Sequence, residues 1–119
     1  METDPTEIER RLPVWHALSE LYLDTELQPS DYQDIAGRLR RSGYSPEALR
    51  QILEDEVAPA FAFNLLDVAG EWASWTEDEV RRIVVRSAGA QPLMRWLRRR
   101  MFRRHLEAEW VKLAPLLAE

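Results

Sequence analysis

The chain has 119 residues, of which 45% are hydrophobic and 31% are charged, a balance that suits one globular domain and excludes a wholly disordered chain. It contains no cysteine, which excludes disulfides, thiolate zinc sites and cysteine nucleophiles. The net charge of −5 is unevenly spread, because residues 1–79 carry 18 acidic and 6 basic side chains (net −12) and residues 80–119 carry 3 acidic and 10 basic ones (net +7).

Helix signals recur along the chain, and strand signals do not. Thr6 and Glu9 have the spacing of a capping box, which predicts a helix that begins near residue 7. Pro13 lies inside this pattern, and it either kinks the helix or opens a second one. The segment is expected to end around Asp24, before the loop that ends in Pro29, and its apolar residues keep helical spacing: Val14, Leu18, Leu21 and Tyr22.

The next two helices have their own start signals. Ser30 and Gln33 form a second possible capping box, and Gly43 suits the left-handed position after a helix. The run Ser45–Glu47 combines a cap, a proline and an acid, which predicts the start of the third helix. The faces expected to be buried in these two helices carry Tyr32, Ile35, Ala36, Leu39, Leu49, Ile52 and Leu53.

Two further helices are expected in the middle of the chain. Pro59 either stops the third helix or opens the fourth, which spans about residues 59–72. This fourth helix is nearly apolar all round, as is typical of a helix at the centre of a fold. A third capping box, Thr76 with Glu79, begins a fifth helix that Gly89 stops.

A long, basic last helix is expected over about residues 92–114. Its apolar residues occupy two roughly opposite faces, one in each half: Leu93, Met94, Leu97 and Met101 first, then Phe102, Leu106, Trp110, Leu113 and Leu117. Three explanations are open: a break near residues 100–103, a second partner for the far half, or a helix that reaches another subunit. We favour the last two together, which predicts an apolar surface that needs a partner.

These elements predict an all-α fold, a single compact domain of about five to six helices with a long C-terminal helix. Residues 1–88 are expected to form a helical core module, and residues 89–119 a long basic helix that packs on the core or on another subunit. The charge balance changes near the same boundary. Either the two halves attract each other within one fold or between subunits, or each attracts a partner of opposite charge.

The sequence contains no recognisable catalytic or metal-binding motif. His16 and His105 lie far apart, and neither has a second histidine at ligand spacing, so both are expected to be packing or surface residues. No serine nucleophile elbow or glycine-rich phosphate loop is present. We therefore expect no enzymatic activity, no metal and no cofactor. The acidic start and the lack of a long apolar run predict a cytoplasmic protein without a membrane span.

Two charged surfaces are the candidate sites. An acidic surface suits a basic protein partner such as the cleft of a nuclease toxin, and its residues are Asp24, Glu26, Asp31, Asp34, Glu54 and Asp55. Of the three consecutive acids 54–56, one is a candidate to face the core, because three neighbours on a helix point in three directions. An arginine run beside a tryptophan on the last helix can bind phosphates and stack a base, or pair with acids, and its residues are Arg95, Trp96, Arg98, Arg99, Arg103 and Arg104.

These surfaces favour a non-enzymatic protein-binding protein of the immunity or antitoxin type. The alternative is a nucleic-acid-binding regulator that uses the arginine-rich helix. The expected partner is therefore another protein, which is a toxin in the inhibitor hypothesis, or a second copy in a homodimer through the last helix. Nucleic acid is the less favoured partner, and no membrane is expected.

Two stretches, residues 12–27 and 56–72, together with the helix start at Ser45, resemble an uncharacterised family of small bacterial proteins. The order and spacing of the family are kept at Glu56, Val57, Pro59, Asn64, Leu65, Leu66, Ala69, Gly70, Glu71 and Trp72. The resemblance covers about residues 8–85 and leaves the arginine-rich tail outside. It implies no function, because no reaction is assigned to that family. On physical grounds, Asn64 in an apolar helix needs hydrogen-bond partners, and Glu71 is a candidate buried carboxylate.

Overall fold

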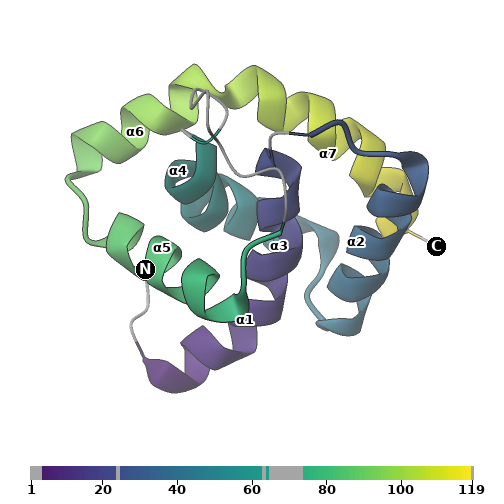
Figure 1. Ribbon diagram of the computed structural model, residues 1–119, viewed down its shortest axis with the longest axis horizontal. Coiled ribbons are helices and arrows are strands. Elements are labelled where there is room, and N and C mark those ends of the chain that lie inside the picture. The colour runs from purple at the N-terminus through teal and green to yellow at the C-terminus, as the bar shows by residue number, and fades with distance from the viewer. Residues whose placement is uncertain (1–3, 24, 63, 65–73, 119) are drawn as a thin grey trace.

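The structure, a computed structural model, describes residues 4–23, 25–62, 64 and 74–118, and these residues confirm the all-α prediction (Figure 1). In chain order the elements are α1 (Pro5–Ser19), the 3-10 turn η1 (Glu20–Tyr22), α2 (Pro29–Arg41), α3 (Pro46–Ile52), the π-helical turn η2 (Leu53–Val57), α4 (Ala58–Phe61), α5 (Glu77–Ala88), α6 (Pro92–Met101) and α7 (Arg103–Leu117). Because α3, η2 and α4 follow one another without a break in helical backbone, they form one segment.

Three of the predicted helix boundaries are confirmed. The Ser45 hydroxyl accepts the backbone N–H of Ala48 at 3.1 Å, as expected of an N-cap. The Thr76 hydroxyl accepts the N–H of Glu79 at 3.2 Å, and the Glu79 carboxylate accepts the N–H of Thr76 at 2.9 Å, which completes a capping box. Gly43 follows α2 with a φ of 82°, the left-handed conformation that glycine adopts without strain.

The first two helices begin about two residues earlier than predicted. Asp4 in place of Thr6 caps α1, and Gln28 in place of Ser30 caps α2. In both helices a proline then occupies the first position, where its missing N–H is not needed. Pro13 lies inside α1, which continues through it rather than opening a second helix.

The π-helical turn η2 carries the third helix past Pro59, where the sequence predicted an end or a new start. Pro59 has no N–H to donate to the carbonyl of Asp55, four residues earlier. In the wider turn, the N–H of Ala58 bonds to the carbonyl of Leu53, five residues earlier. The remainder of the predicted fourth helix, residues 65–72, lies outside the described residues, as do the family positions in that range.

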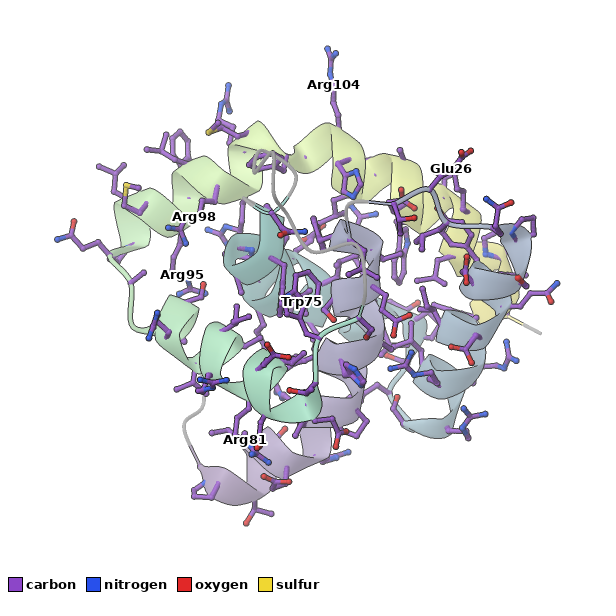
Figure 2. All side chains as sticks on the ribbon, in the orientation of Figure 1. Glu26, Trp75, Arg81, Arg95, Arg98 and Arg104 are labelled. Atoms are coloured by element: carbon purple, nitrogen blue, oxygen red, sulfur yellow. The ribbon has the colours of Figure 1, made fainter. Side chains whose placement is uncertain are left out.

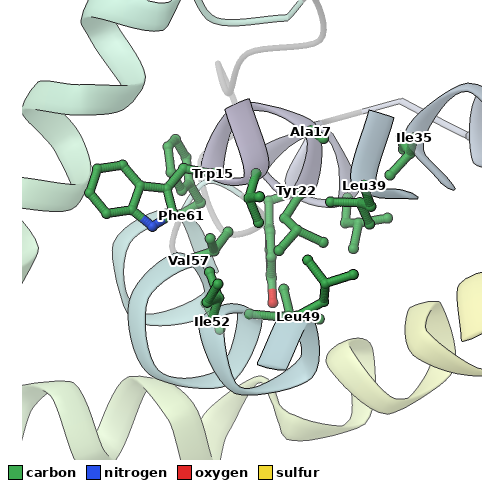
Figure 3. Close-up of a cluster of buried hydrophobic side chains, with 14 of the residues drawn as sticks. Trp15, Ala17, Tyr22, Ile35, Leu39, Leu49, Ile52, Val57 and Phe61 are labelled. Atoms are coloured by element: carbon green, nitrogen blue, oxygen red, sulfur yellow. The ribbon is translucent and has the colours of Figure 1, made fainter. Parts of the chain in front are cut away.

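The core is built mainly by α1, η1, α2 and the segment from α3 to α4 (Figure 3). All seven residues predicted to line the buried faces of the second and third helices are buried. The ring of Phe61 lies 4.7 Å from that of Trp75, centroid to centroid. The side-chain amide of Asn64 donates to the carbonyl of Tyr22 at 2.9 Å, which meets the expectation that this buried amide has a partner. The largest fully buried side chains include Trp15, Tyr22, Leu18, Ile35, Leu39 and Leu49.

The last helical segment is divided into α6 and α7, because the chain turns at Phe102. This confirms the break near residues 100–103, one of the three alternatives that the sequence left open, and α7 is the C-terminal helix. Phe102 has φ −109° and ψ 18°, outside the α-helical range. After the turn, α7 packs against α2 and buries Leu106, Leu113 and Leu117 (Figure 1). The break therefore explains why the two halves bear apolar faces on opposite sides. The far half lies on the chain's own core and needs no second partner, contrary to the explanation favoured from the sequence.

Candidate interaction surface on helix α6

Two arginines of α6 point towards the body of the molecule (Figure 2). The guanidinium of Arg95 donates from Nη2 to the carbonyl oxygen of Asp55 at 2.7 Å, and Arg98 donates from Nη1 to the carbonyl oxygen of Pro59 at 3.3 Å. The first carbonyl is the one for which Pro59 supplies no N–H, and the second lies in the last turn of α4. A backbone carbonyl oxygen carries partial negative charge, so both arginines tie α6 to this helical segment through charge-assisted hydrogen bonds.

A third arginine fixes the same side of α6. Arg99 pairs with the carboxylate of Asp55 at 3.0 Å, and both side chains are about two-fifths exposed. A pair this open to water contributes at most about 1 kcal/mol. None of the residues of α6 is buried, so this helix is held to the body chiefly by polar contacts of its arginines and hardly by apolar packing.

The apolar residues of α6 face the solvent. Leu93 is 64% exposed, Met94 46%, Leu97 38% and Met101 65%. At about 100° per residue, the three positions spaced by four residues fall within an arc of about 80°, so they form one stripe along the helix. We call Leu93, Met94, Leu97 and Met101 the α6 stripe. A surface helix of a globular protein normally buries its apolar side. In α6 the orientation is reversed, and contiguous exposed apolar residues mark interaction sites.

A groove of about 780 Å³ lies beside the stripe and carries four arginines and three acids. It is lined by Glu54, Asp55, Trp96, Arg99, Arg100, Arg103, Arg104, Leu106 and Glu107. Trp96 is 47% exposed, and the guanidinium of Arg100 lies 5.6 Å from its ring centroid, within cation–π range. Arg103 and Arg104 are exposed and form no ion pair with any described residue, and Arg104 points away from the body (Figure 2). These arginines are available to an anionic partner.

The groove also brings together residues that the sequence assigned to two separate surfaces. Asp55 of the predicted acidic surface pairs with Arg99 of the predicted basic one. Glu54 accepts a hydrogen bond from Nε of Arg50 at 2.8 Å, so its charge is also compensated. Electrostatic attraction between the acidic and basic parts of the chain is therefore used in part within the fold itself.

The other described acids of the predicted surface lie on α2 or just before it. Asp34 pairs with Arg38 at 3.4 Å, within α2. Asp31 accepts a backbone N–H at the start of α2 and serves as part of its cap. Glu26 is exposed and makes no ion pair with the described residues (Figure 2), and Asp24 lies outside them. Of the five described acids, Asp34, Glu54 and Asp55 are thus paired with arginines, and Glu26 and Asp31 are not.

The carboxylate of Glu56 is the buried acid among residues 54–56. It accepts the indole N–H of Trp15 at 2.7 Å and a hydrogen bond from the guanidinium of Arg11, and only 9% of its side chain is exposed. Burial alone would lower the pKa of Arg11, but its hydrogen bond to Glu7 and the charge of Glu56 raise it overall. This cluster ties α1 to η2. From the sequence, one of the three acids was expected to face the core, but helical spacing did not indicate which one.

Both histidines have structural partners, as expected. Nε2 of His16 lies 2.7 Å from the carbonyl oxygen of Trp75 and must donate to it, so Nδ1 accepts from Arg38 at 3.1 Å. Nε2 of His105 lies 2.8 Å from the carbonyl oxygen of Leu21. Within the described residues, no three His, Asp or Glu side chains are placed to share a metal ion, and no helix is long and apolar enough to cross a membrane.

Comparison with known protein families gives one match. A family model described as a domain of unknown function (DUF7079) matches residues 9–116. The matched region includes α6 and α7, so the arginine-rich tail is part of the shared domain, contrary to the limits expected from the family resemblance. No curated protein and no solved structure matches the chain.

Proposed function

We propose that this chain, which belongs to the family of the domain of unknown function DUF7079, is a non-enzymatic protein-binding protein whose partner docks on the α6 stripe. The observation that carries the proposal is the reversed orientation of α6. Its arginines contact the body of the molecule, and its apolar residues lie in solvent. A second macromolecule that covers the stripe would bury these apolar side chains, whereas their exposure does not stabilise the fold itself.

The energy available on the stripe is sufficient for a moderate, specific interaction. Complete burial of one large apolar side chain contributes about 1.5–3 kcal/mol. Scaled by the exposed fractions of the four stripe residues and Trp96, burial by a partner contributes about 5 kcal/mol before the entropic cost of association. Charged contacts around the stripe then add to this value and set the choice of partner.

The immunity-type or antitoxin-type inhibitor that the acidic residues suggested stays a prediction. Its acidic surface is the weaker candidate, because Glu54 and Asp55 are already compensated by Arg50 and Arg99. An inhibitor that grips its target through α6 remains compatible with the proposal.

Nucleic-acid binding is the second candidate function. The observation in its favour is the groove, where exposed Trp96 is accompanied by Arg100, Arg103 and Arg104. Such an arrangement of an aromatic ring and arginines can stack a base and bind phosphates. It is less favoured than protein binding because it leaves the α6 stripe uncovered.

Site-specific photocrosslinking in the cells that express the chain tests the proposal. A photoreactive amino acid replaces Leu97, and the matched control places it at Val111, an exposed apolar residue of α7. We expect a discrete crosslinked protein from position 97, absent from position 111 and lost when Leu93 and Met101 are both changed to serine. Equal crosslinking from both positions, or none from position 97, contradicts the proposal.

A further inference from the structure

We infer that the partner of α6 presents an acidic amphipathic helix, an inference that rests on the proposed function and specifies the partner's chemistry. The first ground is the charge of the docking helix. Residues 92–101 contain no acid, and Arg95, Arg98 and Arg99 are engaged with the body of the molecule. The positive charge that remains next to the stripe is that of Arg100, which Arg103 and Arg104 extend beyond the turn at Phe102. A partner that covers the stripe must lie next to this charge, and complementary charge favours the encounter.

The second ground is the shape of the α6 stripe. Leu93, Leu97 and Met101 recur every four residues, which at 1.5 Å per residue gives an apolar ridge about 12 Å long. Met94 widens the ridge at one end. Ridges with this spacing pack into the grooves of a second helix, and an amphipathic helix binds with anchors at the same spacing. The ridge is long enough to engage two to three turns of such a helix.

The third ground is the position of the arginines that remain available. Arg100 borders the stripe beside Trp96, and Arg103 and Arg104 continue past its end; among the described residues none of the three is paired with an acid. A guanidinium binds a carboxylate through two parallel hydrogen bonds. Acids along one edge of the partner helix therefore meet arginines while its apolar edge covers the stripe.

A second copy of the chain fits this surface less well. In a symmetric pair of α6 helices, the stripe of one copy would cover that of the other, but two helices that each carry four arginines and no acid would be brought into contact. Like charges placed opposite each other oppose association. Nucleic acid has the right charge, yet its interfaces are polar and would leave four exposed apolar side chains without a role.

Fluorescence anisotropy with synthetic probes tests the inference on the full chain. The main probe is a labelled helical peptide of about 18 residues with leucine at positions spaced by three and four and glutamate elsewhere. One control peptide replaces every glutamate by lysine, and a second replaces every leucine by serine. Labelled single-stranded and duplex DNA are titrated at the same ionic strength, and sedimentation velocity measures self-association of the chain.

We expect the glutamate peptide to bind about tenfold more tightly than either control peptide or the DNA, and the chain alone to stay monomeric. The double variant Arg100→Glu, Arg104→Glu should lose about tenfold in affinity for the glutamate peptide and gain affinity for the lysine peptide. Arg41→Glu, an exposed arginine of α2 that is unpaired within the described residues, is the matched control and should change neither.

The outcomes separate this inference from the proposed function. If the glutamate and lysine peptides bind equally well and Leu97→Glu abolishes both, the docking surface stands and the acidic partner is wrong. If Leu97→Glu leaves peptide binding unchanged, both are wrong. Tighter binding of DNA than of any peptide assigns the surface to nucleic acid, a dimer that Leu97→Glu dissociates assigns it to a second copy, and no binding of the glutamate peptide also overturns the inference.

Discussion

Truncation of one leucine in each of the two helices that end the chain tests the structural basis of the proposed site. Leu113 of α7 is fully buried, whereas Leu97 of α6 is 38% exposed. Leucine-to-alanine changes in a core remove the transfer energy of the side chain and leave a cavity, so Leu113→Ala should lower the free energy of unfolding by about 3 kcal/mol. Leu97→Ala truncates a partly exposed side chain at the surface and should lower it by about 0.5 kcal/mol.

Urea unfolding followed by far-ultraviolet circular dichroism and by tryptophan fluorescence measures both values. For a domain of this size, the Leu113→Ala change corresponds to a loss of about 12 °C in Tm, and the Leu97→Ala change to about 2 °C. The dependence of the unfolding free energy on urea should be equal in the three proteins, which would show that the same surface is exposed on unfolding. If Leu97→Ala is as destabilising as Leu113→Ala, the α6 stripe is part of the core, and the reasoning behind the binding surface is refuted.

Three further changes test buried polar groups and a helix cap. Glu56→Gln removes the charge that accepts hydrogen bonds from Arg11 and Trp15, and it should lower the free energy of unfolding in urea by about 2 kcal/mol. A decrease below about 0.5 kcal/mol would contradict a buried, paired carboxylate. Thr76→Ala removes the N-cap of α5 and should cost about 1 kcal/mol by the same measurement, and no change would argue against the capping box. Burial raises the pKa of Tyr22, whose hydroxyl has no hydrogen-bond partner among the described residues. The neutral phenol therefore contributes its full stability below about pH 10, the usual pKa of tyrosine, and this stability is lost as the pH rises. The unfolding free energy of Tyr22→Phe should therefore lie within about 0.5 kcal/mol of the wild-type value at pH 7 and above the wild-type value at pH 11. Equal losses of unfolding free energy in both proteins between these pH values would refute the raised pKa of Tyr22.

The helix boundaries that sequence analysis predicted correctly are those set by a side chain close by in the chain. Ser45 and Thr76 each cap a helix through a hydrogen bond three residues away, and Gly43 relieves a strained backbone position. The two boundaries that were displaced begin with a proline preceded by another capping residue, Asp4 or Gln28. Where two polar residues a few positions apart are both able to cap, the preference of proline for the first helical position decides between them.

The turn at Phe102 was only one of three alternatives because helical spacing gives the faces of a helix but not their surroundings. Helical spacing predicted apolar residues on opposite sides of the two halves of the last helix, and we expected the far half to need a partner. In the structure that half covers the core with Leu106 and Leu113, and the near half is the exposed one. The choice depends on where α2 and α4 lie, and local sequence does not contain that information.

The inward arginines of α6 also could not be found from the sequence, because their acceptors are backbone carbonyls. The sequence suggested acids or phosphates as their partners, and Arg99 with Asp55 is the one pair of that kind on α6 among the described residues. Arg95 and Arg98 instead bind the carbonyls of Asp55 and Pro59. The nearest signal in the sequence is Pro59 itself, since a proline inside a helical segment leaves a carbonyl without its usual N–H donor.

Pro59 affects both the helical backbone of the core and the way in which α6, which carries the α6 stripe, is held to it. The carbonyls of Asp55 and Pro59 accept hydrogen bonds from arginines, and a guanidinium reaches them while its own helix stays at the surface. An apolar anchor would have required α6 to turn its leucines and methionines inward, as α7 does. Because α6 is anchored by polar contacts, its apolar side stays exposed to solvent. The family match covers both the segment that contains Pro59 and the whole of α6, so the acceptors, the arginines and the stripe belong to one domain. It follows that Arg95→Leu and Arg98→Leu together should favour inward rotation of α6 and weaken partner binding even though neither arginine is expected to touch the partner.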